Sequence, residues 1–166
     1  IVVSPTLPVG SGDRLMTPPT RLSLAFCRGE LPAFLECNFN VIDVRDVATG
    51  MKIKKKNGRT GVRYLLGAEN IRLSQWLKIL SEETNQPLPQ WKVPYSLALL
   101  VAWLSELWAD YVSGKIPLAT VTGVRLTRRH MFFDSSVSLS ELGLHPRPIR
   151  EAAREAIAWY RSQGWL

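Results

Sequence analysis

The sequence predicts an α/β fold in which helices outnumber a few strands of a parallel sheet. The chain opens with an apolar, β-branched run at 1–4, a pattern typical of a strand buried on both faces. Further strand patterns at 33–35, 38–43 and 63–66 alternate with helical periodicity. Such alternation favours parallel strands joined by helical crossovers. We therefore expect strands 1–3 and 63–66 to be neighbours or near-neighbours in a parallel sheet, with the helix 44–57 crossing between sheet layers.

The opening run also bears on domain organisation. A strand buried on both faces needs neighbours on each side, and a chain does not begin in the middle of a sheet unless other strands precede it. We therefore expect residues 1–166 to form one unit, the later half of a larger α/β protein, after a missing upstream half.

The first helix is expected after a loop rich in proline and glycine at 5–13. Thr17 can cap this helix and Pro18 can occupy its first position. Leu22 and Phe26 then face inward, and Gly29 ends the helix.

The second helix is expected over 44–57, between the strands at 38–43 and 63–66. Its apolar stripe follows i, i+3, i+4, i+7 spacing and consists of Val44, Val47, Ala48 and Met51. Asp43 and Asp46 flank the helix start, where capping is a better explanation than acid–base catalysis.

Four further helices complete the expected order. Ser74 caps one that ends at Asn85 and Pro87, another covers 118–129, Ser136 caps a short one, and Pro148 opens the last. Phe132 and Phe133 are expected to form a short strand.

The most apolar stretch runs from residue 95 to 112. Between Lys92 and Glu106 lie 13 uncharged residues, Val93 to Ser105, whereas a membrane-spanning helix needs about 20. The stretch is therefore a core-facing helix or one lying on a membrane surface. Trp103, Trp108 and Tyr111 suit either place, and packing on a sheet is favoured.

The charged residues of the chain limit which classes of partner we expect it to bind. The net charge of +7 owes much to one run, which comprises Lys52, Lys54, Lys55, Lys56 and Arg59. Its position at a helix end favours a solvated terminus over an anion-binding patch, and the absence of interleaved aromatics predicts no nucleic acid partner. Cys27 and Cys37 are expected to be free thiols in a cytoplasmic protein.

Little catalytic chemistry is visible in the residues. There is no phosphate-cradling glycine motif and no nucleophile elbow. The two histidines and two cysteines lack metal-ligand spacing, so no metal site is expected. No residue is assigned as catalytic.

Four short motifs occur together in a recognisable order. The first motif, V-x-N/S-P-x-x-x-x-G-x-G-D, resembles residues 1–6 with 9–13, and the second, F-V-H-V-D-D-V-A, resembles residues 40–48. The third motif, Y-x-L-G-G/S, resembles residues 63–67. The fourth, D-x-S-K-x-x-x-E-L-G, resembles residues 134–136 with 141–143. Together they resemble the C-terminal half of the extended short-chain dehydrogenase/reductases, the NAD-dependent epimerase/dehydratase family. In detail the chain is most similar to its hopanoid-associated sugar epimerase and dihydroflavonol-reductase-like branch.

The resemblance implies a Rossmann-type fold completed by a mostly helical substrate-binding lobe, and a complete enzyme that binds NAD or NADP. The family's glycine-rich loop and its Tyr-x-x-x-Lys pair are absent here. Ser4 matches a position that meets substrate, and Pro5 and Thr6 match positions near the nicotinamide. Arg125 and Arg128 precede a segment where related enzymes place an arginine against an anionic substrate group.

Two functional hypotheses follow. In the first, the chain is the substrate-binding part of an NAD(P)-dependent sugar epimerase/dehydratase or carbonyl reductase, acts on a sugar derivative or ketone, and is inactive alone. In the second, it is a non-catalytic module that binds anions or a membrane surface. A homodimer and a membrane-peripheral location stay open under both.

Overall fold

The computed structural model describes residues 1–57, 59–108, 120–129 and 131–166, without the side chains of 54–57 and 108. Some predictions therefore lie outside the described part. They concern the side chains of Lys54, Lys55, Lys56, Trp108 and Tyr111, and the start of the helix expected at 118.

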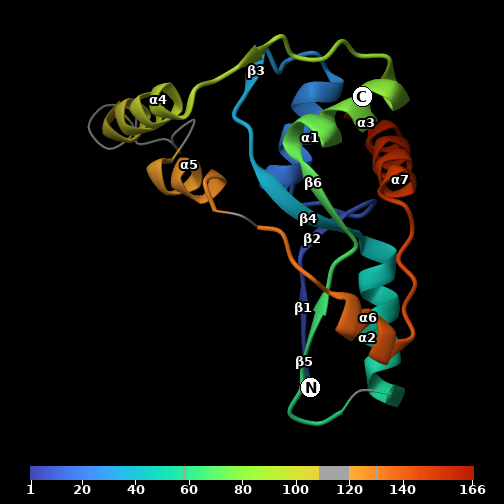
Figure 1. The fold of residues 1–166 in the computed structure, drawn as a ribbon. Helices are drawn as coiled ribbons and strands as arrows, with labels where there is room; N and C mark the ends of the chain where they lie inside the picture. The colour runs from blue at the N-terminus through green and yellow to red at the C-terminus, as the bar shows by residue number, and fades with distance from the viewer. Residues whose placement is uncertain (58, 109–119, 130) are drawn as a thin grey trace.

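The opening strand pairs with one neighbour. Strand β1 (Val2–Pro5) runs parallel to β5 (Arg63–Leu66), with Val2 opposite Arg63, which confirms the predicted pairing of these segments. Helix α2 (Val44–Asn57) precedes β5 and links it to a different sheet (Figure 1). The expectation that β1 is buried on both faces is wrong for this chain, because Ile1 is 42% and Val2 51% exposed.

A three-stranded sheet forms the centre of the main body. Strand β4 (Asn38–Asp43) pairs in parallel with β2 (Leu7–Val9) and antiparallel with β6 (Glu69–Arg72). Strands β2 and β6 were not predicted from the sequence. Both are short, and Pro8 interrupts the first. They become strands because β4 lies between them and supplies hydrogen-bond partners on both of its edges.

The remaining strands are two residues long. Strand β3 (Ala33–Phe34) runs parallel to β7 (Trp91–Lys92), so the strand predicted at 33–35 is present in shorter form. The predicted strand at Phe132 and Phe133 is absent, and this segment is extended without belonging to a sheet. Its backbone instead pairs with the Asn70 side chain.

The helices divide into three groups around these sheets (Figure 1). Those of the main body are α1 (Pro18–Cys27), α3 (Leu73–Thr84) and α7 (Ile149–Ser162). Helix α6 (Ser136–Leu142) lies beside α2 and β5. The projecting pair is α4 (Tyr95–Trp108) and α5 (Val121–Thr127). Helix α3 begins two residues earlier than predicted, because its N-cap residue is Arg72 and not Ser74.

Two packed clusters hold the elements together. The larger joins α1, α3, β4 and α7 through side chains such as Phe26, Val41, Leu77 and Ile157. The smaller joins α2, β5 and α6 through Ile42, Tyr64, Leu66 and Leu142. Strand β4 supplies Val41 to one cluster and Ile42 to the other, because successive side chains of a strand point to opposite faces.

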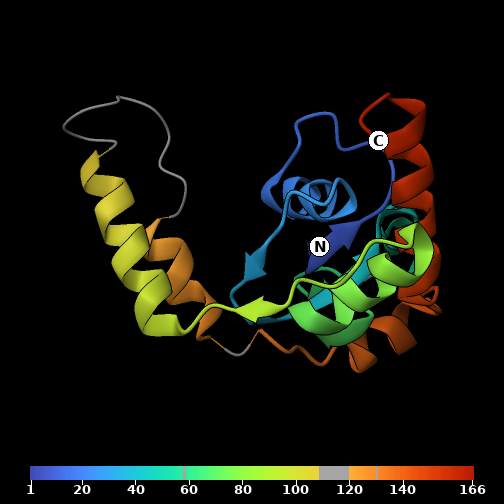
Figure 2. The same cartoon turned by 90° about the horizontal axis from the view of Figure 1, so that it is seen from above.

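Helix α4 stands apart from the sheets and packs against α5 (Figure 2). Ala102 is buried there, but five large apolar side chains are at least 43% exposed: Leu97, Leu100, Val101, Trp103 and Leu104. The expectation that this stretch packs on a sheet is therefore wrong for most of its surface. None of the helices among the described residues is both long and apolar enough to cross a bilayer.

Candidate functional site

The chain changes sheets at Thr6, between β1 and β2. The Thr6 N–H donates to the Leu66 carbonyl at 2.9 Å, which continues the pairing with β5. One residue later the chain pairs with β4 instead, with Leu7 opposite Val41. Ser4, Pro5 and Thr6 therefore lie where a parallel strand ends, the edge at which open α/β sheets bind ligands.

Two side-chain amides, that of the buried Asn40 and that of the exposed Asn70, hold this junction in place. The Thr6 hydroxyl donates to Asn40 Oδ1 at 2.8 Å, and Asn40 Nδ2 donates to Asn70 Oδ1 at 2.8 Å. Asn70 then exchanges two hydrogen bonds with the Phe133 backbone, and the Ser135 hydroxyl donates to the Gly67 carbonyl at 2.8 Å. The junction and the 132–135 segment are thus joined through side chains from β4 and β6.

A cavity of about 620 Å³ begins at the residue after Thr6. Its walls come from β2 and the following loop, the first half of α1, the 37–39 segment, the start of α2, the start of α3, Met131 and Tyr160. The apolar side chains that face it include Leu7, Val9, Pro18, Pro19, Leu22, Phe39, Val44, Leu73 and Trp76. Its volume lies within the range of small-molecule sites.

Asp13 shapes the loop that forms one rim of this cavity. Its Oδ2 accepts hydrogen bonds from the Thr17 N–H at 2.9 Å, the Thr17 hydroxyl at 2.5 Å and the Thr20 hydroxyl at 2.6 Å. Burial raises the pKa of Asp13, but these hydrogen bonds outweigh it and hold the pKa below its ordinary value. Thr17 is the N-cap residue of α1, as predicted, but its side chain makes no capping hydrogen bond and donates to Asp13 instead.

Two other titratable groups line the cavity. Burial raises the pKa of the Cys37 thiol to about 11, so this group is protonated near neutral pH. Burial also raises the pKa of the Tyr160 hydroxyl, against the opposing effect of its hydrogen bond with Thr20. With Asp13 ionised, none of these three groups is poised to transfer a proton near pH 7.

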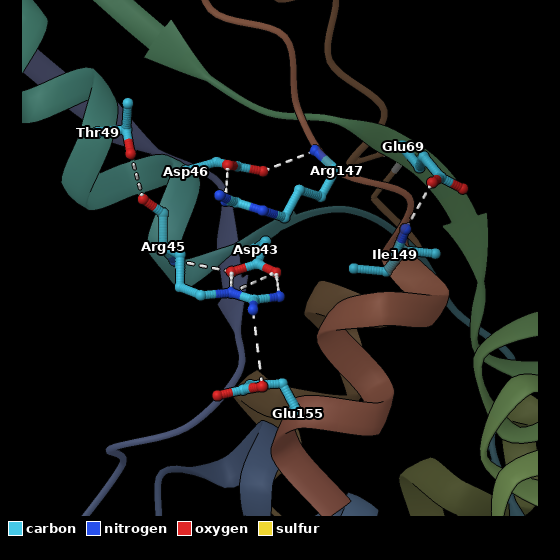
Figure 3. A network of polar contacts seen from close by, with 8 residues as sticks. All are labelled: Asp43, Arg45, Asp46, Thr49, Glu69, Arg147, Ile149 and Glu155. Atoms are coloured by element: carbon cyan, nitrogen blue, oxygen red, sulfur yellow. Dashed lines mark hydrogen bonds and ion pairs between the residues drawn. The ribbon is translucent and has the colours of Figure 1, made fainter.

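A polar network joins α2 to α7 and to the segment before it (Figure 3). Asp43, fully buried, accepts two hydrogen bonds from Arg45 Nε, and Arg45 Nη1 lies 3.6 Å from Glu155 of α7. Asp46 forms an ion pair with the Arg147 guanidinium and accepts a hydrogen bond from the Arg147 backbone N–H at 2.7 Å. Asp43 also caps α2 by accepting from the Arg45 N–H, as predicted, whereas Asp46 joins distant segments and is not a cap.

Arg125 and Arg128 lie on the projecting helix pair. Arg125 lines a separate groove of about 320 Å³ between α4 and α5, together with Leu100 and Trp103. The Arg128 guanidinium stacks 4.6 Å from the centre of the Tyr95 ring. No residue of α4 or α5 is among the described lining of the 620 Å³ cavity. Within this chain, the two arginines and the Ser4–Thr6 junction therefore do not share a cavity.

Comparison with known proteins identifies the family. The chain is 36% identical, over its whole length, to a Synechocystis protein provisionally named dihydroflavonol 4-reductase. It is 31% identical over 99% of its length to sterol demethylase protein B of Methylococcus capsulatus. The chain belongs to the extended short-chain dehydrogenase/reductases. No protein-family model matches it.

Solved structures of extended short-chain dehydrogenase/reductase type have the same fold. The structure of gox2253 shares 35% identity at a TM-score of 0.81 and covers 99% of this chain and 49% of its own. MoeE5, solved with UDP-glucose and NAD, shares the fold alone, at 17% identity and a TM-score of 0.66, over 97% of this chain and 46% of its own.

The chain spans about half the length of the relatives it matches: 49% of the Synechocystis protein and 51% of the Methylococcus protein. The sequence motifs located the strand ends of this short-chain dehydrogenase/reductase half but missed the cavity walls. Trp76 and Tyr160 are far from the motifs in sequence and reach the cavity only through packing. The Asp13, Thr17, Thr20 spacing was the one local signal that could have indicated the capped loop.

Proposed function

We propose that this chain forms the substrate-binding part of an NAD(P)-dependent epimerase/dehydratase or carbonyl reductase. The observation that carries the proposal is the position of the cavity, which begins at Leu7, one residue beyond the carboxyl end of β1 and its junction. A ligand in the cavity would lie beside the strand end at which this family of sheets binds its cofactor. The relatives support this hypothesis and give no support to a non-catalytic module.

The roles of individual residues are part of the same proposal. Ser4, half-buried, faces substrate, and Pro5 and Thr6 contact the nicotinamide end of NAD or NADP. These residues fit a few contacts to the cofactor but not a whole site, because the chain contains no glycine-rich loop to hold its phosphates. When bound, the cofactor supplies hydride transfer. This chain's residues bind and orient the substrate beside it.

The proposal is tested by comparing the chain alone with a fusion protein that includes half of a relative. The 166-residue chain is purified alone and also fused behind the amino-terminal half of the Synechocystis relative. Oxidation of NADH and NADPH is followed with a panel of ketones, and epimerisation with a panel of sugar nucleotides. We expect turnover from the fusion and none from the chain alone.

A matched fusion in which the tyrosine of the supplied Tyr-x-x-x-Lys is changed to phenylalanine controls for contaminating activity. Steady turnover by the chain alone would contradict the proposal. So would a folded fusion that binds NADPH yet converts no member of either panel.

A further inference from the structure

We propose that the 620 Å³ cavity takes an uncharged, largely apolar carbonyl compound and excludes nucleoside diphosphate sugars. This inference rests on the proposed function and names its substrate class. It starts from the charges of the walls: the described lining contains no lysine, arginine or histidine. A diphosphate taken out of water needs cationic or N–H donors to replace its hydration, and guanidinium groups are the usual ones.

The nearest charge has the wrong sign. Asp13 is the one formally charged residue among the described lining, and its hydrogen bonds keep it ionised. A diphosphate in the cavity would therefore meet a carboxylate and no counter-ion. Two arginines next to lining residues in the sequence are already engaged: Arg45 with Asp43, and Arg21 Nε with the Met16 carbonyl at 2.7 Å.

Several polar side chains of the lining are also bonded to one another. The Ser23 hydroxyl donates to the Pro19 carbonyl at 2.9 Å and accepts from Trp76 Nε1 at 3.1 Å. The Thr17 and Thr20 hydroxyls both donate to Asp13. With these groups bonded to one another, the walls present mainly carbon to a ligand, so burial of apolar surface is the main source of affinity.

The shape of the walls suits a ring system. Phe39 and Trp76 contribute flat aromatic faces, and Pro18 and Pro19 add rigid apolar surface at the start of α1. The lining begins at Leu7, the residue that follows the Ser4–Thr6 junction, so in this proposal a carbonyl at one end of such a molecule lies toward the position proposed for the nicotinamide.

Cysteine labelling tests the inference without any turnover. Cys37 lines the cavity, whereas Cys27 is buried elsewhere in the core, 6% exposed, and serves as an internal reference. Iodoacetamide labelling at about pH 9, where some Cys37 is thiolate, is followed by mass spectrometry in the chain and in the fusion. The probes are flavanone and androst-4-ene-3,17-dione as uncharged ketones, and UDP-glucose as the diphosphate.

We expect at least one ketone to slow Cys37 labelling tenfold or more, and UDP-glucose at the same concentration to leave the rate unchanged. Met131→Arg, which adds a cation to a loop residue of the lining, should weaken ketone protection at least tenfold and introduce protection by UDP-glucose. Leu126→Arg, which adds the same charge to an exposed position of α5, should change neither.

Protection of Cys37 by UDP-glucose in the unsubstituted protein would overturn the inference, as would protection by neither ketone up to its solubility. If the isolated chain proves unfolded by circular dichroism, the fusion decides the matter by the same readout. A fusion that binds a ketone but never turns over contradicts the proposed function and leaves the substrate class standing. Turnover of a sugar nucleotide that also protects Cys37 would support the proposed function and contradict the proposed substrate class.

Discussion

Gly67 has almost no room for a side chain. A Cβ built there would lie 2.3 Å from Asn40 Oδ1 and 3.0 Å from Asn40 Cγ, in the middle of the amide network that holds Thr6. Gly67→Ala should therefore displace the Asn40 amide and lower the free energy of unfolding by about 1–3 kcal/mol, as overpacking does. Urea denaturation of the purified chain measures this.

The same position offers a rescue. Adding Asn40→Ser to Gly67→Ala shortens the clashing side chain, so the double variant should lose less stability than the sum of the two single changes. If the losses in unfolding free energy of the two single variants simply add in the double variant, crowding between position 67 and Asn40 is not the cause of the destabilisation.

Asp43 should give the stability of the chain a specific pH dependence. Burial raises the pKa of this carboxyl, but the hydrogen bonds from Arg45 outweigh burial and hold the pKa below its ordinary value. A lowered folded-state pKa contributes stability that is fully present above the unfolded value of about 3.9 and is lost as pH falls through the folded value. The difference in unfolding free energy between the wild type and Asp43→Asn should therefore be largest near neutral pH and shrink below about pH 4.

Urea denaturation of both proteins across this pH range measures the effect. Near neutral pH we expect Asp43→Asn to cost about 1.5–3 kcal/mol, the scale of a hydrogen bond to a charged group, reduced because Arg45 is 38% exposed. Glu155→Gln, which alters only the 3.6 Å contact, is the control and should change stability by less than about 0.5 kcal/mol. A pH-independent difference would refute the assignment.

At the scale of elements, the arginines of the α4–α5 pair distinguish two hypotheses about the charge of the substrate. The sequence predicts that Arg125 or Arg128 meets an anionic substrate group, whereas the apolar cavity calls for an uncharged substrate. In an active fusion, Arg125→Ala and Arg128→Ala distinguish the two. We expect each to change kcat/KM less than tenfold, because neither arginine lines the cavity within this chain.

A larger loss at either position would favour the sequence prediction, since a buried charge-assisted contact costs on the order of 2–5 kcal/mol when truncated. Arg129→Ala, on the same turn, is the matched control for a general change in charge. Thermal unfolding of each variant separates a change in substrate binding from a loss of stability. The cation–π contact of Arg128 with Tyr95 contributes about 0.5–1 kcal/mol to stability at an exposed site.

Elements differ in how much of them the sequence reveals. Helix α7 was predicted from residues that recur at helical spacing, and it buries Ala152, Ala153 and Ala156 as that spacing requires. Strand β2 was not predicted, because three residues around Pro8 carry no periodicity of their own. The difference is physical: a long amphipathic helix records its partner face locally, while a short strand depends on the edge beside it.

At the scale of the whole molecule, the free edge of β1 carries a prediction. Among the described residues β1 pairs with β5 alone, and Val2 is 51% exposed. If the supplied half adds a neighbouring strand, Val2→Lys should change the unfolding free energy of the isolated chain by less than about 0.5 kcal/mol but destabilise the fusion by about 2 kcal/mol or more. Leu15→Lys, at a site that is 85% exposed, should be neutral in both proteins. Equal effects of Val2→Lys in the two proteins would show that β1 has no further partner.

The sequence by itself determined the alternation of strands and helices, the pairing of residues 1–3 with 63–66, and the family. Each of these depends on local periodicity or on short contiguous motifs. Only the tertiary structure decided where the cavity lies and what its walls are made of. Leu7, Phe39, Trp76, Met131 and Tyr160 come from five separate segments, so no stretch of sequence records their meeting. It also decided that α4 leaves most of its apolar surface uncovered, since periodicity shows that a face is apolar but not what covers it.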